Sequence, residues 1–205
     1  MSKYVAGIIG HAIADAMGVP TEFCIREKLQ NKKVTDMIGY GSHDVPAGTW
    51  SDDTTMEIAL IDSYINKGTF DYDDIMVCFY HWLNDAKYTA TDEVFDAGRT
   101  CIQAIINYTK GKEPLDCGLK DEFSNGNGSL MRILPVALYC HAKNLKEKEI
   151  INLTNDTLYP HFSNTLASFS DIVKGIIFLF TSFFFPKYGL CANSIICCLV
   201  LLSPK

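Results

Sequence analysis

An acidic segment flanked by hydroxyl residues carries the clearest chemical signal in this chain of 205 residues. Residues 47–57 read Ala-Gly-Thr-Trp-Ser-Asp-Asp-Thr-Thr-Met-Glu, so Asp52 and Asp53 stand between the hydroxyl residues Ser51 and Thr54. Hydroxyl and carboxylate oxygens at one loop-to-helix junction are the ligands that a hard divalent cation prefers. The segment therefore predicts a cation site.

The same segment also fits a helix start that binds nothing. Thr54 and Glu57 match the S/T-x-x-E capping box, in which each side chain satisfies a free amide of the first turn. Apolar residues follow directly at helical spacing, and Ser, Thr and Asp all favour helix N-termini. From these residues alone, a cation site and a solvated cap remain alternatives.

Three other segments offer groups for a site. Glu22 follows the predicted C-terminus of the first helix, and Asp96 falls on an otherwise apolar predicted helix. Residues 125–132, Asn-Gly-Asn-Gly-Ser-Leu-Met-Arg, form a glycine-rich loop that leads into a helix. Such a loop lets backbone amides approach phosphate oxygens, and a helix N-terminus favours their negative charge. Together these segments supply carboxylates for a metal and a water, and a loop for a phosphorylated ligand.

Helical periodicity predicts the elements that must position these groups. Apolar residues recur at helical spacing over residues 4–17, 54–66, 72–85, 93–109, 129–142, 146–156 and 162–180. Pro135 should kink its helix or restart it. No alternating strand of useful length occurs, so we expect an all-α fold.

Composition narrows the class of protein. The hydrophobic content of 48% is ample for the core of one domain, and the formal charge of −6 comes without a basic stripe. We therefore expect no nucleic-acid partner, and a small cationic or metal-bridged ligand fits better. The 8 cysteines include no C-x-x-C pair, and the N-terminus is a poor signal peptide. Free core cysteines in a reducing compartment, and hence a cytoplasmic protein, are expected.

The C-terminal segment is different in composition. Residues 176–185 and 191–202 are almost wholly apolar, but neither reaches the roughly 20 residues that a transmembrane helix needs. We expect no membrane span. A buried core helix is the first interpretation of this segment, and a membrane hairpin is the alternative.

In order and spacing, the motifs resemble the ADP-ribosylglycohydrolase family, all-α hydrolases that remove ADP-ribose from modified side chains. Residues 14–22, 48–54 and 126–135 carry the resemblance, which covers about residues 3–165. It implies a compact, orthogonal multi-helix domain over residues 1–170, followed by an apolar tail over residues 171–205. It also favours metal ligands over a mere cap at the acidic segment.

The resemblance implies a role for each matching residue. The metal ligands would be Ser51, Asp52 and Asp53, holding a pair of Mg²⁺ or Mn²⁺ ions. The catalytic residues would be Asp96, Glu22 and Asp53. The substrate would be bound by Gly126, Asn127, Gly128 and Ser129 at the diphosphate, and by His161. Arg132 is expected to pair inside the protein. The implied substrate is an ADP-ribosylated protein or small molecule.

Two departures from the family pattern lower the activity that we expect. A Thr-His-x-His-like stretch keeps only its second histidine, His161. The family's second metal-binding motif, an Asp-Thr-Asp-Thr run, is absent. We therefore expect the C-terminal part of the fold to be missing or replaced, metal binding to be weak, and hydrolysis to be impaired. The alternative is a non-catalytic ADP-ribose-binding or structural homologue.

Overall fold

Helices form the whole regular structure of the described part of the chain. A computed structural model describes residues 2–31, 34–121, 124 and 126–158, and no strand occurs among them. The helices and 3-10 turns, in chain order, are α1 Lys3–Gly18, η1 Val19–Thr21, α2 Arg26–Asn31, α3 Asp52–Lys67, α4 Tyr72–Asp85, α5 Arg99–Thr109, η2 Pro114–Asp116, α6 Leu134–Lys143 and α7 Glu147–Leu158. The all-α expectation is confirmed over this part. The predicted helix at 162–180, His161 and the tail lie outside the described residues.

Helix α3 is the central helix of this arrangement, and its sequence marks both of its ends. The Ser51 hydroxyl accepts a hydrogen bond from the backbone amide of Asp53, and two aspartates in the first turn complement the positive end of the helix dipole. Gly68 ends the helix in the left-handed conformation, with φ of 72°. These signals explain why the predicted helix at 54–66 appears almost unchanged.

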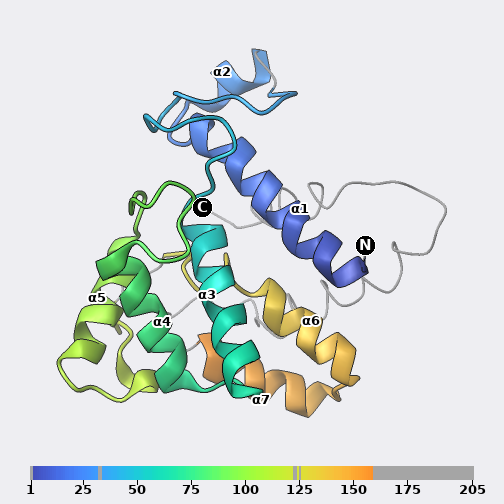
Figure 1. Ribbon diagram of the computed structural model, residues 1–205, viewed down its shortest axis with the longest axis vertical. Helices are drawn as coiled ribbons and strands as arrows, with labels where there is room; N and C mark the ends of the chain where they lie inside the picture. The colour runs from blue at the N-terminus through green and yellow to red at the C-terminus, as the bar shows by residue number, and fades with distance from the viewer. Residues whose placement is uncertain (1, 32–33, 122–123, 125, 159–205) are drawn as a thin grey trace.

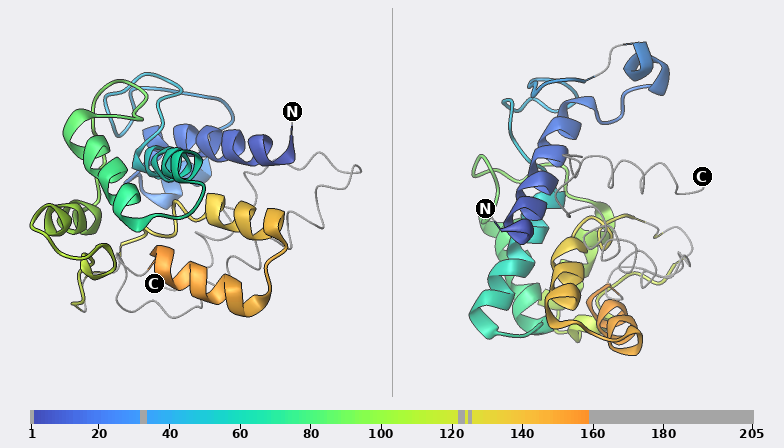
Figure 2. Two further views of the ribbon diagram at one scale, coloured as in Figure 1. Left: turned by 60° about the horizontal axis from the view of Figure 1, so that its bottom comes forward. Right: turned by 90° about the vertical axis from the view of Figure 1, so that its right-hand side faces the viewer.

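Two apolar clusters meet at α3. Met56 and Ala59 pack into a cluster with residues of α4 and α5, whereas Leu60 packs into a second cluster with residues of α6 and α7. Figures 1 and 2 show α3 lying between α1 and α4, with α6 beside it. Because one helix serves both clusters, the position of its N-terminus is fixed relative to most of the described fold.

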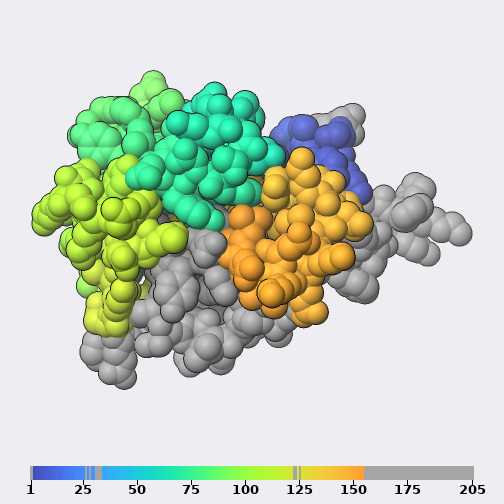
Figure 3. Space-filling view, turned by 90° about the horizontal axis from the view of Figure 1, so that it is seen from below, coloured from blue at the N-terminus to red at the C-terminus, as the bar shows by residue number. Residues whose placement is uncertain are grey.

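Helices α6 and α7 pair on one side of the molecule. Figure 3 shows them next to each other on one face, with α5 at the opposite side of that face. Pro135 occupies the first turn of α6, where its missing amide costs nothing. Of the two alternatives, a kink or a new helix start, Pro135 therefore marks a helix start.

Three local predictions were wrong. The helix predicted over 93–109 begins only at Arg99, so Asp96 lies in the preceding loop with φ of 53° instead of on a helix. The helix predicted over 129–142 begins at Leu134. The capping box of Thr54 and Glu57 does not form, because Ser51 is the N-cap and both of those side chains turn toward α1. In the last case, contacts with α1 decided where these side chains turn.

The described cysteines are all free. Those that are buried, as expected, are Cys78, Cys101, Cys117 and Cys140, whereas Cys24 is only half-buried.

Among the described helices, none is long and apolar enough to cross a membrane.

Candidate active site

Asp15 of α1 holds the start of α3 in place. Both the backbone amide and the hydroxyl of Ser51 donate hydrogen bonds to its carboxylate, at 3.0 and 2.7 Å. The amide and the hydroxyl of Thr54 do the same at 3.1 and 2.6 Å. One carboxylate therefore collects otherwise free amides of the first turn, and this contact fixes the direction in which the next two side chains leave the helix.

Asp52 and Asp53 carry closely spaced negative charge in a poorly solvated place. Burial, with repulsion from Asp53 and then Asp96, raises the pKa of Asp52 to about 8. Burial and repulsion from Asp15 raise the pKa of Asp53 to about 6, although His11 and the Ser51 hydroxyl oppose the rise. The two carboxylates are therefore short of compensating positive charge.

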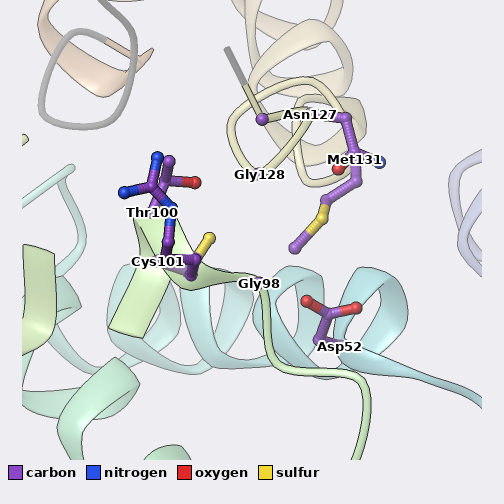
Figure 4. A pocket seen from close by; sticks show the side chains of 9 residues that line it. Asp52, Gly98, Thr100, Cys101, Asn127, Gly128 and Met131 are labelled. Atoms are coloured by element: carbon purple, nitrogen blue, oxygen red, sulfur yellow. The ribbon is translucent and has the colours of Figure 1, made fainter. Parts of the chain in front are cut away.

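Asp52 lines a pocket of about 230 Å³ together with the glycine-rich loop. Its carboxylate points toward the space between the start of α5 and the loop that carries Asn127 and Gly128 (Figure 4). Two sulfur-containing residues, Cys101 and Met131, border the same space. Two segments that the sequence singled out, more than 70 residues apart, thus meet at one cavity.

The glycines of this loop are required by the close approach of α5. A Cβ atom on Gly128 would lie 2.3 Å from Sγ of Cys101, and one on Gly126 would lie 2.7 Å from Oγ1 of Thr100. Bare backbone therefore faces the pocket, as phosphate binding requires. Ser129 differs from its neighbours, because it is fully buried, its hydroxyl has no hydrogen-bond partner, and it does not line the pocket.

Glu22, His43 and Asp96 form a second group of polar side chains. One ligand atom from each lies within 4.8 Å of the others, and Nε2 of His43 is 2.7 Å from Oε2 of Glu22. Burial is the main cause that raises the pKa of Glu22 to about 7, and the Asp96 carboxylate adds to the rise against the effect of His43. Glu22 can therefore hold or release a proton near neutral pH.

A buried histidine–glutamate pair lies between α1 and α3. Nδ1 of His11 bonds to Oε2 of Glu57, whereas Oε1 of Glu57 has no partner. Burial lowers the pKa of His11, but the bond to Glu57 and the nearby Asp53 and Asp15 outweigh burial and raise it. The imidazole thus places positive charge next to the carboxylates at the start of α3.

Arg132 is an interior residue, as expected. Its side chain is 1% exposed, it donates to the carbonyl of Gly128, and its guanidinium lies 4.9 Å from the Phe79 ring centroid. Burial lowers the pKa of Arg132 to about 10. The guanidinium therefore supports the glycine-rich loop from behind.

The residues at the start of α3 suit a divalent cation. Ser51, Asp52 and Asp53 offer only oxygen donors, which Mg²⁺ and Mn²⁺ prefer. Burial and neighbouring carboxylates raise the pKa of each aspartate, and a bound cation would favour the ionised form. The donor chemistry and the electrostatics thus both fit the metal that the family resemblance implies.

The structure brings four of the predicted site residues to one pocket, and Ser51, Asp53 and Ser129 do not line it. It adds two residues that the sequence did not single out. Asp52 shares the pocket with Gly126, Asn127 and Gly128, and Asp96 raises the pKa of both Asp52 and Glu22. No sequence pattern pointed to His43 as a site residue, since a lone histidine in a glycine-rich loop belongs to no recognisable motif. Asp15 lies inside a stretch that carries the family resemblance, but only the fold shows that its carboxylate binds Ser51 and Thr54.

Comparisons with known proteins agree with this arrangement. Residues 1–167 match the ADP-ribosylglycohydrolase family. The ADP-ribosylarginine hydrolase Tri1 of Pseudomonas putida (strain GB-1) is 32% identical over 139 residues, which are 68% of this chain and 36% of that protein. The ADP-ribosyl-[dinitrogen reductase] glycohydrolase of Rhodospirillum rubrum is 32% identical over 138 residues, 66% of this chain and 44% of that protein.

A solved structure shows the same fold. An ADP-ribosylglycohydrolase-related protein complex aligns with a TM-score of 0.63 at 24% identity, over 87% of this chain and 53% of that chain. The chain also spans less than half the length of the curated relatives that it matches.

An all-α fold in which Asp52, at the start of α3, meets a glycine-rich loop at one pocket describes the class of protein. Within that class, the match over residues 1–167 identifies the particular group. The chain belongs to the ADP-ribosylglycohydrolase family.

Proposed function

We propose that this protein hydrolyses the glycosidic bond that links ADP-ribose to a modified side chain, and that the side chain is an arginine. The single observation that carries the proposal is the pocket where Asp52 meets Gly126, Asn127 and Gly128. The Asp52 carboxylate there, next to bare glycine backbone, supports a site for a cation and a diphosphate. The arginine acceptor is supported by the name of the Pseudomonas relative, an ADP-ribosylarginine hydrolase.

In this proposal, Ser51, Asp52 and Asp53 would hold Mg²⁺ or Mn²⁺. When bound, such a cation supplies positive charge that polarises the ribose hydroxyls. Backbone amides of residues 126–128 would bind the diphosphate and orient the ribose toward the start of α3. The binding energy of the diphosphate would thus hold the anomeric carbon at the carboxylates, where reaction requires it.

Asp96 and Glu22 are proposed to handle the protons. The bond between the anomeric carbon and the acceptor nitrogen breaks through an oxocarbenium-like state, which nearby carboxylates stabilise. A water oxygen then bonds to that carbon and gives its proton to Asp96. Glu22, whose pKa is about 7, gives a proton to the leaving nitrogen.

The test is release of ADP-ribose from an ADP-ribosylated arginine peptide in the presence of Mg²⁺ or Mn²⁺. Asp53→Ala should abolish release, and Asp116→Ala, which changes an exposed aspartate far from the pocket, should not. Release that continues undiminished after the divalent cations are chelated would refute the mechanism.

A second candidate is a non-catalytic ADP-ribose-binding homologue. It is favoured by the glycine-lined pocket, because backbone amides bind a diphosphate without any metal. Calorimetry separates the two functions. If ADP-ribose binds but its arginine conjugate is never cleaved, the binding protein is favoured. The absence of any ADP-ribose binding would refute both functions.

A further inference from the structure

Three rings form a tilted row next to the Glu22 and Asp96 carboxylates. The His43 ring lies between Phe23 and Phe95, with centroid separations of 6.0 and 5.3 Å and interplanar angles of 59° and 56°. Phe23 is 87% exposed, and neither phenylalanine belongs to the two apolar clusters of the core. Phe23 therefore contributes little to the core, and its exposed ring is open to a ligand.

The row and the carboxylates belong to one surface. His43 bonds to Glu22, and Asp96 directly follows Phe95 in the chain. The π faces of Phe23 and Phe95 and the two carboxylates attract positive charge. This surface complements a flat cation better than an anion or an apolar group.

Contacts place this surface beside the glycine-lined pocket. Gly98, which follows Asp96 by two residues, lines that pocket together with Asp52. Asp96, Glu22 and His43 each bring one ligand atom within 4.8 Å of the others. Asp96 therefore links the pocket to the ring row. If the diphosphate lies at the glycines and the bond breaks near Asp96, the group beyond that bond lies at the row.

We propose that Phe23, His43 and Phe95 form the subsite that binds the guanidinium of the modified arginine and so determine acceptor specificity. A guanidinium is planar and weakly hydrated, so it stacks on aromatic faces while its N–H groups donate to carboxylates. A compact ammonium does this less well, and the oxygen of a serine conjugate carries no charge to attract. The inference rests on the proposed function for the identity of the acceptor and for the position of the diphosphate.

Direct binding tests the subsite without any turnover. Butylguanidine, a minimal arginine side chain, is titrated into the full chain, with butylamine as the ammonium comparison. The wild type should bind butylguanidine more tightly than butylamine. Phe23→Leu with Phe95→Leu should weaken butylguanidine binding about three- to tenfold, since both aromatic faces are lost but apolar bulk remains. Ile25→Ala, a matched change at a neighbouring residue that is 70% exposed, should leave the affinity unchanged.

Three results would overturn the subsite. The first is a double variant that binds butylguanidine as tightly as the wild type, and the second is a wild type that does not bind it. The third is a double variant that loses affinity for free ADP-ribose to the same extent, because the row would then hold the adenine. With the arginine conjugate as substrate, the expected change is a higher KM at nearly constant kcat. A wild type that binds butylguanidine but never releases ADP-ribose would refute the proposed function and leave the subsite standing.

Discussion

At the scale of single residues, Asp15 does the most to shape the site. Its carboxylate accepts hydrogen bonds from the amides and hydroxyls of both Ser51 and Thr54, which ties α1 to the first turn of α3. Bonds of this kind to a charged acceptor are about twice as strong as neutral ones. This contact fixes the first turn of α3, from which Asp52 lines the pocket.

Asp15→Asn should therefore destabilise the protein. The amide nitrogen of asparagine would face donors, so the free energy of unfolding should fall by about 1.5–3 kcal/mol. Urea denaturation measures the change. Asp116→Asn is the control, because Asp116 is exposed and its pair with Lys120 should contribute under about 0.5 kcal/mol. An equal effect of both substitutions would contradict the role assigned to Asp15.

At the scale of elements, the glycine-rich loop packs directly against α5. Gly128→Ala would place a Cβ atom 2.3 Å from Sγ of Cys101, so the loop or the helix must shift. We expect a loss of about 1–3 kcal/mol in the free energy of unfolding, together with weaker ADP-ribose binding. Gly18→Ala, where a Cβ atom meets nothing within 4 Å, should not destabilise the protein.

A second substitution tests the cause of that loss. Combining Gly128→Ala with Cys101→Ala removes the sulfur atom that the new methyl group meets. The double variant should be more stable than the sum of the single effects predicts, by an amount measurable in a double-mutant cycle. Simple additivity would show that the clash with Cys101 is not the cause.

The contact between α1 and α3 also contains the buried His11–Glu57 pair. His11→Leu would leave Glu57 buried without its counter-ion, at a cost of about 3–5 kcal/mol in the free energy of unfolding. The double variant His11→Leu/Glu57→Leu should recover most of that loss, since two apolar side chains replace the pair. Chemical denaturation of the two variants decides, and a double variant as unstable as the single one would contradict the argument.

At the scale of the whole molecule, the excess of carboxylates couples stability to pH and to cations. The pKa values of Asp53, Glu22 and Asp52 are raised to about 6, 7 and 8, so the folded state holds protons that the unfolded chain releases near pH 4. Stability without cations is therefore greatest below about pH 4 as far as these groups are concerned, and is lost as pH rises toward about 8.

Thermal denaturation at about pH 5 and pH 8 checks this coupling. Without divalent cations the midpoint should be lower at the higher pH because of these groups, and Mn²⁺ should restore it mainly at the higher pH, where the carboxylates are ionised. Asp52→Asn should flatten the cation-free pH dependence and reduce the effect of Mn²⁺. A Mn²⁺ effect that is equal at both pH values would argue against binding at these aspartates.

The predictions from sequence succeeded where the signals were local. Helix α3 carries its own cap, acidic first turn and terminal glycine, and α4 appears with the predicted bounds 72–85. They failed at the start of α5. The apolar residues of 93–98 suggested helix, but this stretch is a loop: the chain bends at Asp96, and Gly98 caps α5.

The sequence by itself determined that this chain is helical, that Asp52 and Asp53 begin a helix, and that a glycine-rich loop follows at a distance suited to the family. Those features depend on residues that are neighbours in the chain, so capping signals and hydrophobic periodicity can predict them. Only the tertiary structure decided that the loop meets Asp52 at one pocket, that Asp96 joins Glu22 and His43, and that Ser129 turns inward. The reason is physical: packing around α3 brings together groups that lie far apart in the chain, and no local pattern contains that information.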